Sequence, residues 1–222
     1  MSSHHIVREG QEPALLIANG EACSRELLDQ LLEWSPYVLV LDGALDKVLN
    51  LGIKFDAILG DFDTYNQDEI SAMVQPNTEV VYTPDQEKTD LEKGLEFLIA
   101  KKFAAVNIIW ATGKRSDHYM NNIAILARYK DQINLVMLDN YSKIYPINSG
   151  YKKHFSENTN VSLIPLNKVE KVKTSNLVWN LDNETLDYPY RTSSSNKVLA
   201  TGIVEVNFDN GILLMMECID LH

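Results

Sequence analysis

Two aspartates stand two positions apart directly after a short apolar run. In the stretch GDFDT, residues 60–64, Asp61 and Asp63 follow the apolar residues 57–59. At a separation of roughly 5 Å and an effective dielectric constant of about 20, two unit negative charges repel by about 3 kcal/mol. Turn-forming aspartates that hydrogen-bond their own backbone are one explanation for such a pair. A bound divalent cation that offsets the repulsion is the other.

Similar polar stretches follow the ends of the other predicted strands. They read NGE, DGALD, TPDQEKTD and ATGKRSD, and they supply Asp42, Asp85, Asp90 and Asp117. In an open parallel sheet the carboxyl ends of the strands share one edge, where ligands bind. Taken singly, Asp42 fits a turn, and Asp90 and Asp117 fit the first turn of a helix. Gathered at one edge, these acids need hard cations, and Mg²⁺ typically binds one or two carboxylates together with phosphate oxygens.

The fifth polar stretch also supplies cations. Arg115 suits a phosphate because its guanidinium donates two parallel hydrogen bonds, although an ordinary surface arginine is the alternative. Lys114 stands before it, but the run TGKRS is not a P-loop, because Ile108 occupies the position of the required first glycine. His118 lies one turn into a helix, where a histidine is more often a structural hydrogen-bonding residue than a base.

Composition narrows the class of protein. The 222 residues carry a formal net charge of −11 at pH 7, with 45% hydrophobic and 23% charged residues and a pI near 4.9. We therefore expect a globular protein that binds neither nucleic acid nor an anionic membrane surface. Cys23 and Cys218 lie outside any C-x-x-C motif, so no disulfide framework or thiolate zinc site is predicted. Without a signal-peptide pattern in residues 1–13 or a membrane-spanning run, the expected location is the cytoplasm.

The first two thirds of the chain alternate between strand and helix patterns. Apolar runs without alternation predict strands covered on both faces, at residues 14–18, 37–41, 57–59, 79–82, 106–110 and 133–138. The clearest helix covers residues 89–101 and starts with a capping box of Thr89 and Glu92. A second helix starts at Ser116. This alternation predicts a mostly parallel, Rossmann-like α/β domain over residues 1–145.

The pattern changes after residue 140, where strand-like runs take over at residues 161–166, 169–174 and 202–218. Within the last run, Asn210-Gly211 predicts a two-residue β-hairpin turn. We therefore expect a small all-β domain over residues 146–222.

Two stretches of the predicted β domain bear on ligand binding. Trp179 in the run SNLVWNL would usually be a core residue, and the run SSSN at residues 193–196 is typical of a loop. Together they form, alternatively, an aromatic shelf with polar contacts for a flat, cationic heterocycle.

The ordered set of motifs resembles the thiamine pyrophosphokinase family. The matching stretches are LDGA (41–44), LGIKFDAILGDFDT (51–64), DQEKTDLEKGLEF (85–97), GKRSDHYMNN (113–122), LVWNL (177–181) and SSSN (193–196). The GDFD element combined with D-Q-x-x-T-D-x-E-K is the specific part of this resemblance. The chain departs from the family pattern at four positions. Serine is common in the family at the position of Thr64, glycine at the positions of Ala44 and Lys114, and an aromatic residue at the position of Ser116.

The resemblance implies transfer of a pyrophosphoryl group from ATP to the hydroxyethyl oxygen of thiamine, with Mg²⁺, giving thiamine diphosphate and AMP. It implies a nucleotide- and metal-binding α/β domain and a thiamine-binding β-sandwich, in a homodimer with active sites at the subunit junction. Matched by motif, Mg²⁺ and the phosphates would be held by Asp61, Asp63 and Asp90. The nucleotide and reacting centre would be surrounded by Asp42, Gln86, Arg115 and Asp117, and thiamine by Trp179, Ser195 and Asn196.

Other functions stay open from the residues alone. A Mg²⁺-dependent phosphohydrolase or a nucleotide-sugar transferase would use the same D-x-D carboxylates. A non-catalytic sensor of thiamine diphosphate would need only the aromatic shelf.

Overall fold

The structure is a computed structural model that describes residues 12–65 and 67–219. The chain divides into two compact units. Unit 1 comprises Met1–Ile125 and Asp131–Leu135, and unit 2 comprises Leu126–Lys130 and Val136–His222. The predicted assignment of catalytic and thiamine-binding roles to residues 1–145 and 146–222 stays a prediction.

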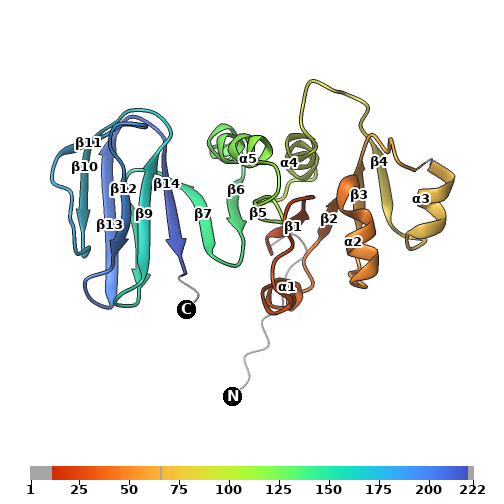
Figure 1. The fold of residues 1–222 in the computed structure, drawn as a ribbon, viewed down its shortest axis with the longest axis horizontal. Coiled ribbons are helices and arrows are strands. Elements are labelled where there is room, and N and C mark those ends of the chain that lie inside the picture. Colours follow the sequence, from red (N-terminus) through yellow and green to blue (C-terminus); the bar gives the residue numbers. More distant parts are fainter. Residues whose placement is uncertain (1–11, 66, 220–222) are drawn as a thin grey trace, which may run out of the picture. The chain divides into compact units, whose positions relative to one another are not determined.

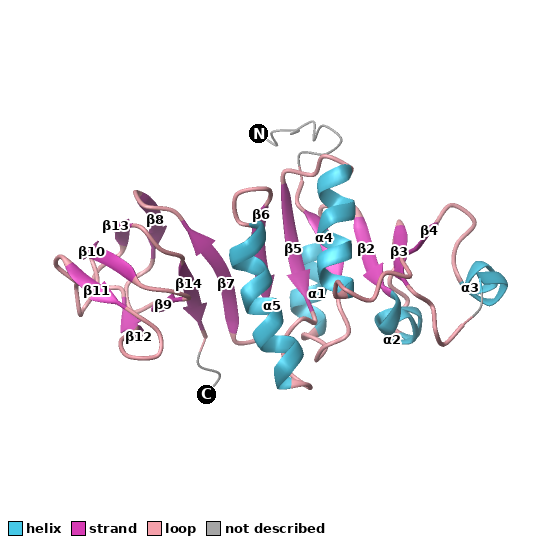
Figure 2. Ribbon diagram, turned by 90° about the horizontal axis from the view of Figure 1, so that it is seen from above, coloured by secondary structure: helices cyan, strands magenta, loops and turns pink. Residues whose placement is uncertain are grey.

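Unit 1 is built on parallel strands. They are β1 (Ala14–Ile17), β2 (Val38–Leu41), β3 (Ala57–Gly60), β4 (Glu79–Tyr82) and β5 (Ala105–Ile109). Their order is β5-β1-β2-β3-β4, and every neighbouring pair among them is parallel. Every residue of β1, β2 and β3 is buried, as expected for strands covered on both faces. Figure 2 shows these strands side by side, with α4 lying over them.

The helices of unit 1 connect these strands. They are α1 (Arg25–Leu32), the 3-10 turn η1 (Asp42–Ala44), α2 (Leu45–Asn50), α3 (Gln67–Met73) and α4 (Asp90–Ala100). Figure 1 shows α4 on one face of the parallel strands and α1 and α2 on the other, which is the predicted two-sided covering. The helix α5 (Ser116–Tyr129) and the strand β6 (Asn134–Leu138) both cross the division between the units.

The capping box at the start of α4 is confirmed. The Thr89 side chain accepts from the Glu92 backbone N–H, and the Glu92 carboxylate accepts from the Thr89 backbone N–H at 3.2 Å. This reciprocal pair fixes where the helix begins, so Asp90 becomes its first residue.

Unit 2 is an antiparallel β structure. Its strands are β7 (Ser142–Ile147), β8 (Tyr151–Phe155), β9 (Asn160–Pro165), β10 (Val169–Ser175), β11 (Glu184–Leu186), β12 (Ser193–Lys197), β13 (Gly202–Asp209) and β14 (Leu213–Cys218). One layer runs β12-β9-β14-β7-β6, and the other is a 4-stranded sheet in the order β11-β10-β13-β8. Side chains from both layers form one buried cluster, with Leu163 and Met215 from the first and Val172 and Val204 from the second. This arrangement confirms the small all-β sandwich.

The hairpin predicted at Asn210-Gly211 is wrong. Both residues have positive φ, at 40° and 93°, as a tight turn requires. However, β13 pairs with β10 and β8, whereas β14 pairs with β7 and β9. The turn therefore carries the chain from one layer of the sandwich to the other, because each of the two strands finds its hydrogen-bond partners in a different sheet.

Within the described residues, no helix combines the length and the apolar character that crossing a bilayer requires. Residues 1–11, most of the segment read for a signal peptide, lie outside the described part of the chain.

Candidate active site

A cavity of about 450 Å³ lies where the strands of unit 1 end. Its walls come from the segments that follow β1, β2, β3 and β5 and from the start of α4. The predicted site residues that line it are Asp42, Asp61, Gln86, Asp90 and Arg115. The fold thus brings together acids that are up to 48 positions apart in sequence, from Asp42 to Asp90.

Asp42 is held between two loops by its own carboxylate. Oδ1 accepts from the Gly43 N–H at 2.6 Å, and Oδ2 accepts from the Phe62 N–H at 3.1 Å. Gly60 makes room for this side chain, because a Cβ at residue 60 would lie 2.1 Å from both Cγ and Oδ2 of Asp42. Burial, together with the negative charges of Asp90 and Asp61, raises the pKa of Asp42 above its ordinary value of 3.8.

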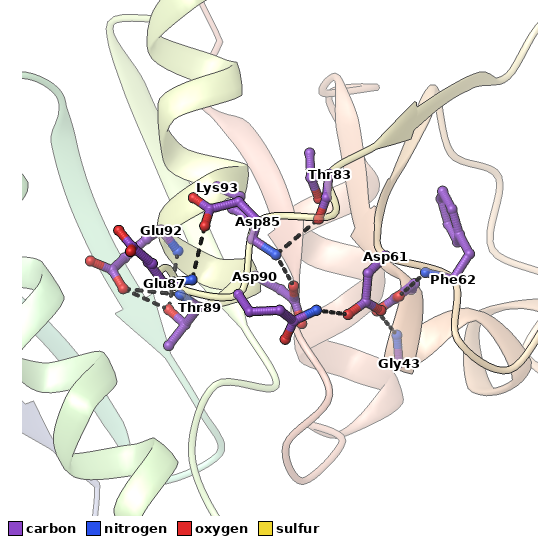
Figure 3. A network of polar contacts seen from close by, with 12 residues as sticks. Gly43, Asp61, Phe62, Thr83, Asp85, Glu87, Thr89, Asp90, Glu92 and Lys93 are labelled. Carbon is purple, nitrogen blue, oxygen red and sulfur yellow. Dashed lines mark hydrogen bonds and ion pairs between the residues drawn. The ribbon is translucent and has the colours of Figure 1, made fainter.

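Asp61 is oriented by a glutamine from a different loop. The Gln86 side-chain amide donates to Oδ2 of Asp61 at 2.8 Å, and this bond lowers the pKa of the Asp61 carboxyl. Between Asp61 and Asp63, Phe62 has a left-handed backbone with φ of 54°. Figure 3 shows this network around Asp61, Phe62 and Gly43. Asp61 is therefore ionised and aimed at the cavity.

Asp90 is paired with a buried lysine, the last residue of the D-Q-x-x-T-D-x-E-K element, for which no role was predicted. Lys93 is 7% exposed and lies one helical turn after Asp90, with Nζ 3.3 Å from its Oδ1. The same ammonium donates to the Thr83 carbonyl at 3.0 Å. Figure 3 shows Lys93, Asp90 and Thr83 in this arrangement. The signal in the sequence was the i,i+3 spacing of an acid and a lysine on one helix.

Arg115 and Asp117 form a two-bond ion pair at the start of α5. Nε of Arg115 lies 3.1 Å from Oδ1 of Asp117, and Nη2 lies 2.5 Å from Oδ2. This pair lowers the pKa of Asp117 to about 2. Arg115 lines the cavity, whereas Asp117 and Asp63 are exposed and lie outside its lining.

A second pair of cations lies near the end of β1. The Lys114 ammonium donates to the Asn19 carbonyl at 3.0 Å, and the Lys47 ammonium donates to the Gly20 carbonyl at 2.9 Å. Lys47 also lies over the ring of Trp110, 5.1 Å from its centroid. Trp110 is 1% exposed and lines the cavity, and its Nε1 has no hydrogen-bond partner among the described residues. Lys47 and Trp110 were not predicted as site residues.

The acids suit a hard metal ion whose coordination shell is completed by the ligand. Among residues 12–65 and 67–219, no three His, Cys, Asp or Glu side chains are grouped tightly enough to hold a metal by themselves. However, Asp42, Asp61 and Asp90 line the same cavity, and the negative charges of Asp90 and Asp61 add to burial in raising the pKa of Asp42. Carboxylates that repel one another without a closed coordination shell fit Mg²⁺, which takes one or two protein carboxylates and fills its remaining positions with phosphate oxygens and water.

The predicted thiamine-contacting residues belong to unit 2. Trp179 is 60% exposed, in contrast to an ordinary core tryptophan. Asn196 is 2% exposed and clamps the tryptophan backbone: its Oδ1 accepts from the Trp179 N–H at 3.1 Å, and its Nδ2 donates to the Trp179 carbonyl at 2.7 Å. Ser195 is exposed, and its backbone N–H donates to the Ser162 hydroxyl at 3.0 Å. Asn196 thus positions an exposed aromatic ring.

Comparisons with known proteins cover both units. Residues 28–137 match the family model described as "Thiamin pyrophosphokinase, catalytic domain", and residues 149–213 match "Thiamin pyrophosphokinase, vitamin B1 binding domain". The chain is 25% identical over 195 residues to thiamin pyrophosphokinase 1 of Caenorhabditis elegans, covering 79% of this chain and 76% of that protein. It is 25% identical over 185 residues to thiamine pyrophosphokinase of Bacillus subtilis, covering 81% of this chain and 86% of the relative.

The crystal structure of a Bacillus subtilis thiamine pyrophosphokinase has the same fold. It superposes with a TM-score of 0.78 at 21% sequence identity, over 95% of this chain and 100% of that one. At this level of identity the comparison bears on the fold alone.

Proposed function

The chain belongs to the thiamin pyrophosphokinase family, and on this premise we propose that it transfers the pyrophosphoryl group of ATP to the hydroxyethyl oxygen of thiamine, giving thiamine diphosphate and AMP. The observation that carries the proposal is the meeting of Asp42, Asp61 and Asp90 with several cations at one cavity. A bare cluster of acids would repel a polyphosphate, and a bare cluster of cations would not hold a metal. A cavity lined by both suits a magnesium polyphosphate.

Asp61 and Asp90, joined by Asp63, would hold Mg²⁺ and, through it, the phosphates. When bound, the ion would neutralise charge on the phosphate oxygens as the pyrophosphoryl group is transferred. The protein contributes the orientation of its carboxylates: Gln86 fixes Asp61, and Lys93 fixes Asp90. Asp42 stays in place through its two backbone N–H bonds.

Arg115 would contact the reacting phosphates. Asp117 uses Nε and Nη2 of the guanidinium, so both N–H groups of Nη1 remain for a phosphate oxygen. Asp117 thereby becomes a positioning residue. Because the pKa of Asp117 is about 2, its carboxylate is a weak base near neutral pH.

Trp179 would stack on the flat, cationic thiamine ring system. Its exposed ring and the buried clamp from Asn196 support this role, since the ring is held in place without being covered within unit 2. Ser195 would add a polar contact. We further propose a homodimer in the cytoplasm, with each active site completed at the subunit junction.

The direct test is a mass-spectrometric product assay with ATP, thiamine and Mg²⁺, with EDTA as the control. Thiamine diphosphate and AMP in equal amounts are expected, and EDTA should abolish both. The Asp61→Asn variant should lose well over tenfold in turnover. Asp29→Asn is the matched control, because Asp29 is an exposed acid of unit 1 in a surface ion pair with Arg25.

The same assay separates the other functions. Orthophosphate or a released nucleoside diphosphate would contradict the proposal and favour a phosphohydrolase or a nucleotide-sugar transferase. Quenching of tryptophan fluorescence by thiamine diphosphate without ATP consumption would instead favour a sensor. Near-normal turnover of Asp61→Asn would remove the metal role.

A further inference from the structure

Two ammonium groups beside the cavity have no acidic partner. Lys114 donates to the Asn19 carbonyl and lies 3.5 Å from its side-chain oxygen, and Lys47 donates to the Gly20 carbonyl. Among residues 12–65 and 67–219, neither lysine has a carboxylate within the 4.0 Å ion-pair distance. Both are therefore anchored on neutral oxygens of adjacent residues.

The other cations that line the cavity are different. Lys88 pairs with Glu96 at 2.8 Å, Lys93 with Asp90 at 3.3 Å, and Arg115 with Asp117 at 2.5 Å. Each of these positive charges is offset within unit 1. Among the described residues that line the cavity, Lys114 is the cation whose charge is not offset by a carboxylate.

Bringing the two lysines together has a cost that unit 1 does not offset. The pKa of Lys47 is lowered to about 8, first by burial and then by a hydrogen bond to Lys114 and the positive charge of that lysine. The charged groups on the surrounding segments are otherwise engaged: Asp46 accepts from the Tyr65 hydroxyl, and Arg115 is paired. The Glu21 carboxylate lies next to Gly113, where an added Cβ would meet its Oε2 at 2.6 Å, but within the described part of the chain it forms no ion pair with either lysine. An anion is the missing partner.

We propose that Lys114, supported by Lys47, binds the terminal phosphate of the oligophosphate donor and makes the site prefer a triphosphate to a monophosphate. The inference rests on the proposed function for the identity of the donor. After its bonds to the carbonyl and side-chain oxygens of Asn19, the Lys114 ammonium retains one N–H group for a phosphate oxygen. Lys114 shares the cavity with Asp61 and Asp90, so a chain of phosphates has metal-binding acids and a separate cationic contact in the same cavity.

The chain offers matched variants. Lys114 has a left-handed backbone with φ of 52°, which glycine adopts without strain, so Lys114→Gly removes the ammonium and preserves the loop. Lys102→Gly is the control, because Lys102 is also exposed, has φ of 67° and lies outside the cavity lining. Lys47→Met keeps an apolar stem over Trp110 and removes the charge together with its bond to the Gly20 carbonyl.

Isothermal titration calorimetry without thiamine measures the affinity for Mg-ATP, AMP and inorganic tripolyphosphate. Because a charge-assisted hydrogen bond is lost, Lys114→Gly should bind Mg-ATP and tripolyphosphate roughly tenfold or more weakly. Its affinity for AMP should stay within about threefold of wild type, and Lys102→Gly should match wild type for every ligand. Equal tripolyphosphate affinity in Lys114→Gly and wild type would overturn the proposal.

The pH profile tests the part played by Lys47. Its charged form favours the anion and is lost as pH rises through about 8, so wild-type affinity for tripolyphosphate should fall across that range. In Lys47→Met this step should be absent, and a step that persists would overturn the support from Lys47. If the variant does not fold, as judged by circular dichroism, proton uptake on binding of tripolyphosphate is measured at pH 8 in wild type and Lys114→Gly. Uptake by wild type would support the role of Lys47 in binding the anion, and its absence would overturn that role.

The two proposals fail separately. Tripolyphosphate binding that depends on Lys114, in a protein that forms no thiamine diphosphate, would overturn the proposed function and keep the phosphate contact. Formation of thiamine diphosphate by a protein whose Lys114→Gly variant binds tripolyphosphate normally would overturn the contact and keep the function.

Discussion

Replacing Gly60 by alanine tests how the acid cluster is held. The added Cβ would lie 2.1 Å from Cγ and Oδ2 of Asp42 and 2.5 Å from its Cβ. Carbon atoms in contact normally lie about 3.5–4.0 Å apart, so the Asp42 side chain has to move by more than about an ångström. It would then lose the bonds from Gly43 and Phe62, and with them the geometry of the loop that carries Asp61.

The magnitude follows from these contacts. Overpacking of a well-packed site costs about 1–3 kcal/mol, and each lost hydrogen bond adds about 1 kcal/mol. Gly60→Ala should therefore lower the free energy of unfolding by about 3–5 kcal/mol. Turnover should fall by more than about tenfold, because an ångström of displacement at a reacting centre is enough for a loss of that size.

Urea unfolding followed by circular dichroism measures the first effect, and the product assay measures the second. Gly202→Ala is the control, since its added Cβ would meet only atoms at 3.6 and 3.9 Å, and its stability should change by less than about 1 kcal/mol. A Gly60→Ala protein with wild-type stability and turnover would refute the argument that Gly60 exists to admit Asp42.

Three further outcomes are expected. In Asp90→Asn the pKa of Asp42, measured by NMR titration, should fall toward 3.8, since burial and the charge of Asp90 both raise it; an unchanged pKa would mean that the two acids do not interact. Thr89→Ala should lower the free energy of unfolding by about 1 kcal/mol through loss of the helix cap, while Thr89→Ser stays within a few tenths; equal losses would rule out the cap as the cause. Asn196→Ala should raise the KM for thiamine more than it lowers kcat, because it frees the backbone of Trp179, and Trp179→Phe should retain more activity than Trp179→Ala; a normal KM in Asn196→Ala would contradict the positioning role.

Local and periodic features of this protein could be predicted from its sequence. The runs at β1, β2 and β3 are apolar throughout because both of their faces are covered, and the capping box of Thr89 and Glu92 joins residues only three positions apart. The gathering of acids at one edge follows from a general property of parallel sheets, in which strand carboxyl ends share an edge. These features need no knowledge of distant partners.

Tertiary structure decided what depends on such partners. The turn at Asn210-Gly211 has hairpin residues, yet its strands pair in different sheets, because their hydrogen-bond partners come from elsewhere in the chain. Lys47 and Lys114 are far apart in sequence, and the fold anchors them on the carbonyl groups of two adjacent residues, Gly20 and Asn19. Residue types and spacing determined which side chains were available for chemistry. Long-range packing determined which groups surround each of these side chains, and therefore how deeply it is buried and how its charge is stabilised.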